Sequence, residues 1–136
     1  MATAREIYGA AEDGEEYPRL SDYGPLLQSL GEIIAQVDED GYSGDSFVLL
    51  RDGERWGYLC FGWGSCSGCD ALQGCASWQD VEDLREFLAG RVRWDTREGT
   101  SQFLRDHDWE GDWRPALGRE FAAKALAALG GVPHGR

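Results

Sequence analysis

The sequence predicts a small α+β domain, in which a β-hairpin or small antiparallel sheet packs against three to four helices. The dipeptide Asp52-Gly53 separates two β-prone runs, which is typical of a hairpin. Apolar residues recur at helical spacing in several other segments. A chain of 136 residues with 42% hydrophobic side chains is long and apolar enough for one domain with its own core.

The first 24 residues differ in composition from the rest of the chain. They mix acidic residues with Gly, Tyr and Pro and show no apolar period. We therefore expect residues 1–24 to form a flexible acidic arm and residues 25–136 to form the single α+β domain.

The first predicted helix follows Pro25, a residue suited to the first helical position. Apolar residues at helical spacing then predict an amphipathic helix of about three turns. Its apolar residues are Leu26, Leu27, Leu30, Ile33, Ile34 and Val37. The acidic stretch 38–45 ends this helix as a loop.

The hairpin is predicted to consist of strands 46–51 and 56–61, joined by the turn 52–55. Successive side chains of a strand point to opposite faces. Trp56, Tyr58 and Cys60 therefore share one face of the second strand, and Leu59 and Phe61 share the other.

A second helix is predicted after the hairpin. Ser77 and Asp80 form a capping box in front of an apolar stripe, and Gly90 can end the helix. Residues 91–94 follow as a short strand.

Two more helices are predicted in the C-terminal part. Thr100 or Ser101 caps a short helix that reaches His107. Pro115 leads into the last helix, which Gly130-Gly131 ends.

The charge balance restricts the kind of partner. With 13 basic and 25 acidic side chains, the formal net charge is -12, and a field of this sign repels nucleic acid and anionic lipid. The longest aliphatic or aromatic run, Phe47-Val48-Leu49-Leu50, is far too short for a membrane span. The N-terminus lacks the apolar segment of a secretory signal, so we expect a cytoplasmic protein with no nucleic-acid or membrane partner.

All four cysteines fall within one stretch, with the spacing Cys60-x5-Cys66-x2-Cys69-x5-Cys75. The C-x2-C pair is a common half of a zinc site, which needs four tetrahedral ligands. Zinc held by Cys60, Cys66, Cys69 and Cys75 is therefore one interpretation. The spacing of the first three cysteines also resembles that of vertebrate-type [2Fe–2S] ferredoxins, whose fourth cysteine lies far downstream, whereas no cysteine follows Cys75.

Three other interpretations of the cysteine loop need no metal. Cys66 and Cys69 could act as a redox dithiol. The run 64–68 fits the pattern G-x-C-x-G of a nucleophile elbow, with His107 as base and Asp95 or Asp106 to orient it. Alternatively, the cysteines serve only as small apolar residues that pack a tight loop.

Tryptophans provide the candidate binding residues. Trp56 and Trp78 belong to patterned segments and are expected in the core. Trp63, Trp109 and Trp113 lie among Gly, Asp and Glu in predicted loops, a composition typical of interface hot spots. They could equally cover the core beneath those loops.

The run 56–72, with the loop Gly62-Trp63-Gly64-Ser65-Cys66-Ser67-Gly68-Cys69-Asp70, resembles a stretch found in small bacterial and phage proteins of no known activity. The similarity extends to the run 106–111. This resemblance implies a bacterial or phage origin and transfers no catalytic residue.

Together these observations predict a non-enzymatic, acidic protein-binding module of bacterial or phage origin. It would use a charged, aromatic surface to bind a protein with a basic surface, for instance as an inhibitor or regulator. The alternative is a zinc- or thiol-dependent protein centred on Cys66 and Cys69; otherwise we expect no cofactor.

Overall fold

The computed structural model describes residues 2–9, 18, 20–66 and 68–131. It confirms the α+β prediction, with an antiparallel sheet in the order β1-β2-β3-β4. The strands are β1 (Glu32–Asp38), β2 (Gly44–Asp52), β3 (Arg55–Trp63) and β4 (Arg93–Asp95). The helices are α1 (Ala4–Ile7), α2 (Gly24–Leu30), α3 (Trp78–Arg91), α4 (Arg97–Asp106) and α5 (Pro115–Gly131), with a 3-10 turn, η1 (Trp109–Gly111).

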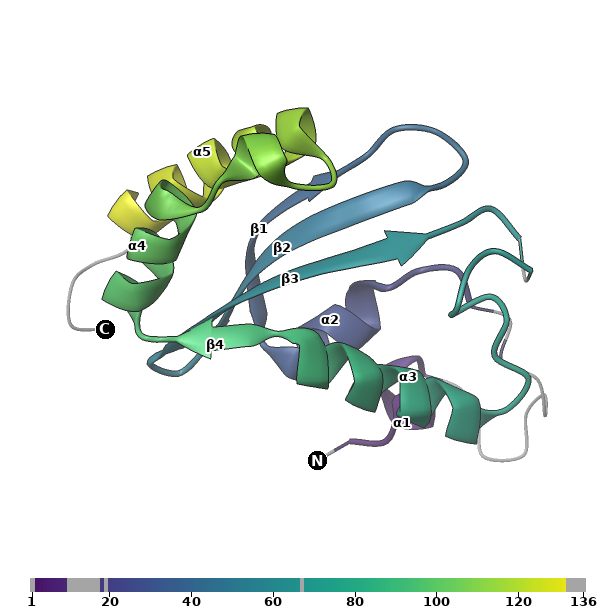
Figure 1. Ribbon diagram of the computed structural model, residues 1–136. Coiled ribbons are helices and arrows are strands. Elements are labelled where there is room, and N and C mark those ends of the chain that lie inside the picture. Colours follow the sequence, from purple (N-terminus) through teal and green to yellow (C-terminus); the bar gives the residue numbers. More distant parts are fainter. Residues whose placement is uncertain (1, 10–17, 19, 67, 132–136) are drawn as a thin grey trace.

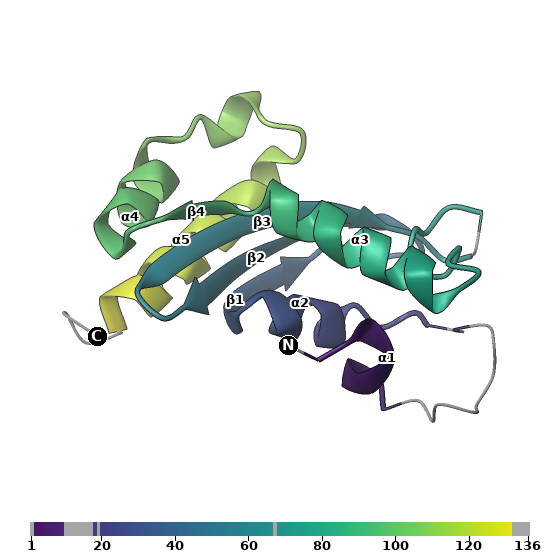
Figure 2. The ribbon, with the colours of Figure 1, turned by 90° about the horizontal axis from the view of Figure 1, so that it is seen from below.

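The sheet lies between two layers of helices, with α4 and α5 on one face and α1, α2 and α3 on the other (Figures 1 and 2). Strand alternation divides the core accordingly. Val48 and Leu50 point toward the layer of α2 and α3, whereas Phe47 and Leu49 point toward the layer of α4 and α5. The continuous apolar run of β2 is buried because both of its faces are covered.

The predicted hairpin is confirmed as β2 and β3, joined by a two-residue turn. Gly53 has φ +62°, a left-handed conformation that glycine adopts without strain. Trp56 packs in the core beneath α5, and Leu59 and Phe61 pack in the opposite core, as the alternation predicts.

The helix predicted to span Leu26 to Val37 is wrong in its second half. The helix α2 ends at Leu30, and the following segment is strand β1, paired with β2. Gly31 is extended, with φ 169°, and its backbone packs so close to Arg51 that a Cβ would lie 2.9 Å from the Arg51 carbonyl oxygen. The β-branched residues of this segment suit a strand, and pairing with β2 overrides the helical spacing.

The helix α3 begins as predicted, because the Ser77 side chain accepts a hydrogen bond from the Asp80 amide. The short strand is confirmed as β4, and α5 begins at Pro115. The predicted start of α4 is wrong, since Thr96 is its N-cap. Thr100 is fully buried, and its hydroxyl donates to the Trp56 carbonyl instead, at 3.3 Å.

Part of the predicted arm packs on the domain. The helix α1 lies against α3, where Ala4 is fully buried and Arg85 donates a hydrogen bond to the Ala2 carbonyl. The Tyr8 hydroxyl donates to the Asp22 carbonyl at 2.7 Å. Residues 2–8 of the predicted flexible arm therefore contact the domain, and residues 10–17 and 19 lie outside the described residues. Within the described part, no helix has the length and apolar character needed to cross a bilayer.

Candidate functional site

The loop between β3 and α3 is shaped by one buried carboxylate, that of Asp70. Its Oδ1 accepts hydrogen bonds from the Tyr23 hydroxyl and from the amides of Leu72 and Gln73, at 3.1, 2.9 and 3.0 Å. Its Oδ2 accepts from the Gly64 amide at 2.8 Å. Gly64 itself leaves no room for a side chain, because a Cβ would lie 2.6 Å from the Cys69 carbonyl oxygen. This network fixes the two ends of the loop that carries Cys66 and Cys69.

Cys66 and Cys69 lie together at the surface of this loop, with their sulfur atoms 3.0 Å apart. The Cys69 amide donates to the Cys66 carbonyl at 3.1 Å, and the Cys66 amide donates to the Cys69 sulfur at 3.3 Å. The hydrogen bonds from the Cys66 thiol and amide hold the pKa of the Cys69 thiol below its usual value. The spacing of the pair therefore predicted its proximity correctly.

The four predicted metal ligands do not converge. Cys60 packs against the core beneath α5, and Cys75 is buried in the core on the other face of the sheet, where its thiol donates to the Ala71 carbonyl. Burial raises the pKa of both thiols, that of Cys60 to about 11. Among the described residues, no group of three or more His, Cys, Asp or Glu side chains is placed to hold a metal ion. The structure therefore does not bring the four cysteines into one site, since they occupy three separate places.

His107 is paired away from the cysteine loop. Its Nε2 lies 2.7 Å from Asp112 Oδ2, and its ring packs on Trp109 with the centroids 4.4 Å apart. Partial burial acts to raise the pKa of Asp112, but the hydrogen bonds from His107 and the Trp113 amide outweigh it and lower that pKa. These contacts give His107 a structural role beside η1, and they do not support it as a base for Cys66.

The three predicted binding tryptophans have different surroundings. Trp109 is only 7% exposed, and its Nε1 donates to the Leu104 carbonyl at 3.0 Å, so it belongs to the core and not to the exposed surface. Trp63 is half-buried, with its Nε1 donating to Ser46 Oγ at 3.0 Å. Trp113 is 76% exposed and is therefore the one of the three that is free to contact a partner.

A second feature, which the sequence did not reveal, is the incomplete pairing of β3. The strand β4 pairs only with Trp56, Gly57 and Tyr58, and β3 continues beyond it to Trp63. Because the hairpin has a two-residue turn, Asp52 and Arg55 form its closing hydrogen-bonded pair. From there, hydrogen-bonded and non-hydrogen-bonded pairs alternate along β2 and β3. The alternation directs the main-chain N–H and C=O groups of Cys60 and Gly62 away from β2, toward an edge with no further described strand. Gly62 is exposed at this edge.

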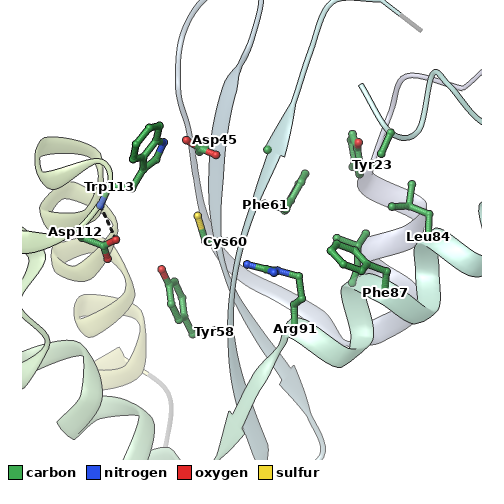
Figure 3. Close-up of a pocket in the computed structure, with 13 residues that line it drawn as sticks. Tyr23, Asp45, Tyr58, Cys60, Phe61, Leu84, Phe87, Arg91, Asp112 and Trp113 are labelled. Carbon is green, nitrogen blue, oxygen red and sulfur yellow. Dashed lines mark hydrogen bonds between the residues drawn. The ribbon is translucent and has the colours of Figure 1, made fainter. Parts of the chain in front are cut away.

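A cleft of about 470 Å³ lies along this edge (Figure 3). Two exposed aromatic side chains line it from opposite sides: Phe87 of α3, 59% exposed, and Trp113, which precedes α5. A guanidinium stacks over each ring, that of Arg91 at 5.5 Å from the Phe87 centroid and that of Arg114 at 5.4 Å from the Trp113 centroid. Phe87 was not among the residues predicted from the sequence, although an aromatic residue next to Leu88, outside the apolar stripe of α3, was a usable signal.

Two acidic side chains, Asp45 and Asp112, line the cleft, and Asp83 is exposed on α3 one turn before Phe87. Arg114, which pairs with Asp45 at 3.1 Å and with Glu39 at 3.4 Å, and Arg91 offset part of this charge. No family model, curated protein or solved structure matches this chain.

Proposed function

We propose that this protein is a non-enzymatic protein-binding module of bacterial or phage origin, which binds an extended segment of a basic partner along the open edge of β3. The loop resemblance is the support for this origin, and a cytoplasmic setting is part of the proposal. The partner would be a protein, with no nucleic acid and no membrane bound directly. By occupying such a segment, the module could act as an inhibitor or regulator.

The observation that carries the proposal is the outward main chain of Cys60 and Gly62, with which no described strand pairs, beside a cleft with exposed aromatic walls. Natural proteins usually cover or charge a sheet edge, because an open edge invites another strand. A peptide added to an edge gains affinity from main-chain hydrogen bonds and specificity from pockets for its alternate side chains. Phe87 and Trp113 line the cleft from opposite sides, so they could contact such side chains of a bound peptide (Figure 3).

Charge supports a basic partner. Beside the cleft, the carboxylates of Asp45, Asp83 and Asp112 outnumber the guanidiniums of Arg91 and Arg114. The net charge of the whole chain, -12, has the same sign. An acidic field accelerates association with a cationic segment and repels a second copy of this chain.

The test uses two synthetic peptides, one of alternating valine and lysine and one of alternating valine and glutamate. The proposal predicts that the lysine peptide binds, that salt weakens its binding, and that the glutamate peptide does not bind. Trp113→Ala and Phe87→Ala should weaken binding of the lysine peptide. Tyr42→Ala should not, because Tyr42 is an exposed aromatic residue, 87% exposed, that does not line the cleft.

Two matched variants of Gly62 test whether the open edge of β3 binds the peptide through its main chain. Gly62 lacks a positive φ, and an added Cβ would meet only an ordinary contact, 3.4 Å from Asp45 Oδ1. Gly62→Ala keeps the outward N–H, whereas Gly62→Pro removes it without touching the ladder to β2. We expect the alanine variant to bind like the parent and the proline variant to bind about tenfold more weakly. Equal binding by two folded variants would contradict the proposal.

A further inference from the structure

We propose that Cys66 and Cys69 form a thiol–disulfide exchange site for disulfide substrates, with Cys69 as the attacking thiol and Cys66 as the resolving thiol. This inference is independent of peptide binding at the β3 edge. It rests on the position of the two sulfurs, on their exposure and on the loop that holds them.

The geometry of the turn suits a reversible disulfide. Residues joined by a turn hydrogen bond of this kind, from the amide of one to the carbonyl three residues earlier, have Cα atoms within about 7 Å. A disulfide needs Cα atoms roughly 4.4–6.8 Å apart, so the turn between Cys66 and Cys69 can close without moving its ends. The sulfurs, 3.0 Å apart, already face each other.

The surroundings distinguish the two thiols. The Cys69 sulfur accepts a hydrogen bond from the Cys66 amide at 3.3 Å, which favours its thiolate, the reactive form. In the thiol–thiol contact either sulfur can donate, and the Cys69 thiol also lies 3.5 Å from the Cys66 carbonyl oxygen, to which it donates when protonated. Both residues are exposed, so a disulfide can approach, whereas Cys60 is half-buried and Cys75 is buried. The Asp70 network fixes the loop from beneath, so oxidation leaves the surrounding main chain in place.

The exchange proceeds in two balanced steps. The Cys69 thiolate attacks one sulfur of a substrate disulfide; the substrate S–S bond breaks, a mixed disulfide forms on Cys69, and one substrate thiolate leaves. Cys66 then loses its proton to solvent and attacks the Cys69 sulfur, which releases the second substrate thiolate. Two electrons pass to the substrate, and the dithiol becomes the Cys66–Cys69 disulfide.

The experiment treats the reduced, folded full-length chain with dithiodipyridine, a disulfide whose released thiopyridone absorbs light. We expect a rapid release of two equivalents per chain, a mass loss of two hydrogens and no retained adduct. Cys66→Ser should react at Cys69 with one equivalent and keep the adduct. Cys69→Ser should react at Cys66 several-fold more slowly, because the more ionised thiol is lost.

Two controls keep the outcome unambiguous. Cys60→Ser should leave the rapid release unchanged, and circular dichroism checks that each variant is folded. A retained adduct on the reduced parent chain would overturn the exchange site, and faster reaction of Cys69→Ser than of Cys66→Ser would overturn the assigned roles. The Gly62→Pro variant should show the parental release, so a failure of peptide binding does not affect this test.

Discussion

Replacing Asp70 by asparagine should destabilise the protein by about 3 kcal/mol, because its amide cannot accept all of the hydrogen bonds that the carboxylate accepts. If the amide nitrogen of the asparagine replaces Oδ2, it faces the Gly64 N–H, and neither group can accept the hydrogen bond that the other donates. If it replaces Oδ1, it faces three donors, including the Tyr23 hydroxyl. Asp70 is only 4% exposed, so water cannot easily satisfy the group that is left unpaired.

The expected loss of about 3 kcal/mol follows from the hydrogen bonds that the Asp70 carboxylate accepts. One buried donor without an acceptor costs about 1–3 kcal/mol, and the remaining hydrogen bonds lose the assistance of the negative charge. Tyr23→Phe is the matched control, at a cost of about 1 kcal/mol, since it removes one donor to the carboxylate and leaves the carboxylate and the three amides in place. The Leu72 amide, which also donates to the Tyr23 hydroxyl at 3.3 Å, keeps its shorter hydrogen bond to Asp70 Oδ1 at 2.9 Å. Urea unfolding measures both changes as shifts of the midpoint at constant slope. If Asp70→Asn is no more destabilising than Tyr23→Phe, the carboxylate does not hold the loop.

Three further predictions test the fold and its charges. In urea unfolding, Trp109→Ala should cost about 3–5 kcal/mol, whereas Trp113→Ala should stay within about 0.5 kcal/mol. In thermal unfolding, Gly57→Ala should lower the midpoint, because its Cβ would lie 2.5 Å from a buried side chain, and Gly90→Ala should raise it, because that helical site is open. The pKa of Asp112 is lowered in the folded protein, so its ionised carboxylate stabilises the fold at neutral pH. The difference in unfolding free energy between the parent and Asp112→Asn should disappear as pH falls below about 3.9 and through the folded-state pKa. Unfolding of both proteins over a series of acidic pH values measures this difference.

The sequence predicted those elements whose signals are local. The hairpin depends on Asp52-Gly53 between β-prone runs, and the start of α3 depends on the Ser77 cap; neither requires a distant partner. The segment 32–38 was misassigned because its apolar spacing fits a helix, while pairing with β2 makes it a strand. Tertiary pairing of this kind overrides local propensity. The spacing of apolar residues does not show which distant strand a segment pairs with.

The candidate site was predictable to a smaller extent. The C-x2-C spacing placed Cys66 and Cys69 together, because a single turn joins them. It could not show that Cys60 and Cys75 pack on opposite faces of the sheet, although the strand alternation already assigned Cys60 to the face of Trp56. The open edge depends on β4 ending after three residues of pairing, a property of the assembled sheet.

Amide hydrogen exchange along β3, resolved residue by residue, tests the open edge most directly. In the free protein, we expect slow exchange at Leu59 and Phe61, whose amides point to β2, and fast exchange at Cys60 and Gly62, whose amides point outward. On addition of the valine–lysine peptide, exchange at Cys60 and Gly62 should become slow, while exchange at Leu59 and Phe61 stays slow. Equal protection of all four amides in the free protein would refute the open edge, and unchanged exchange at Cys60 and Gly62 with peptide bound would refute peptide binding along it.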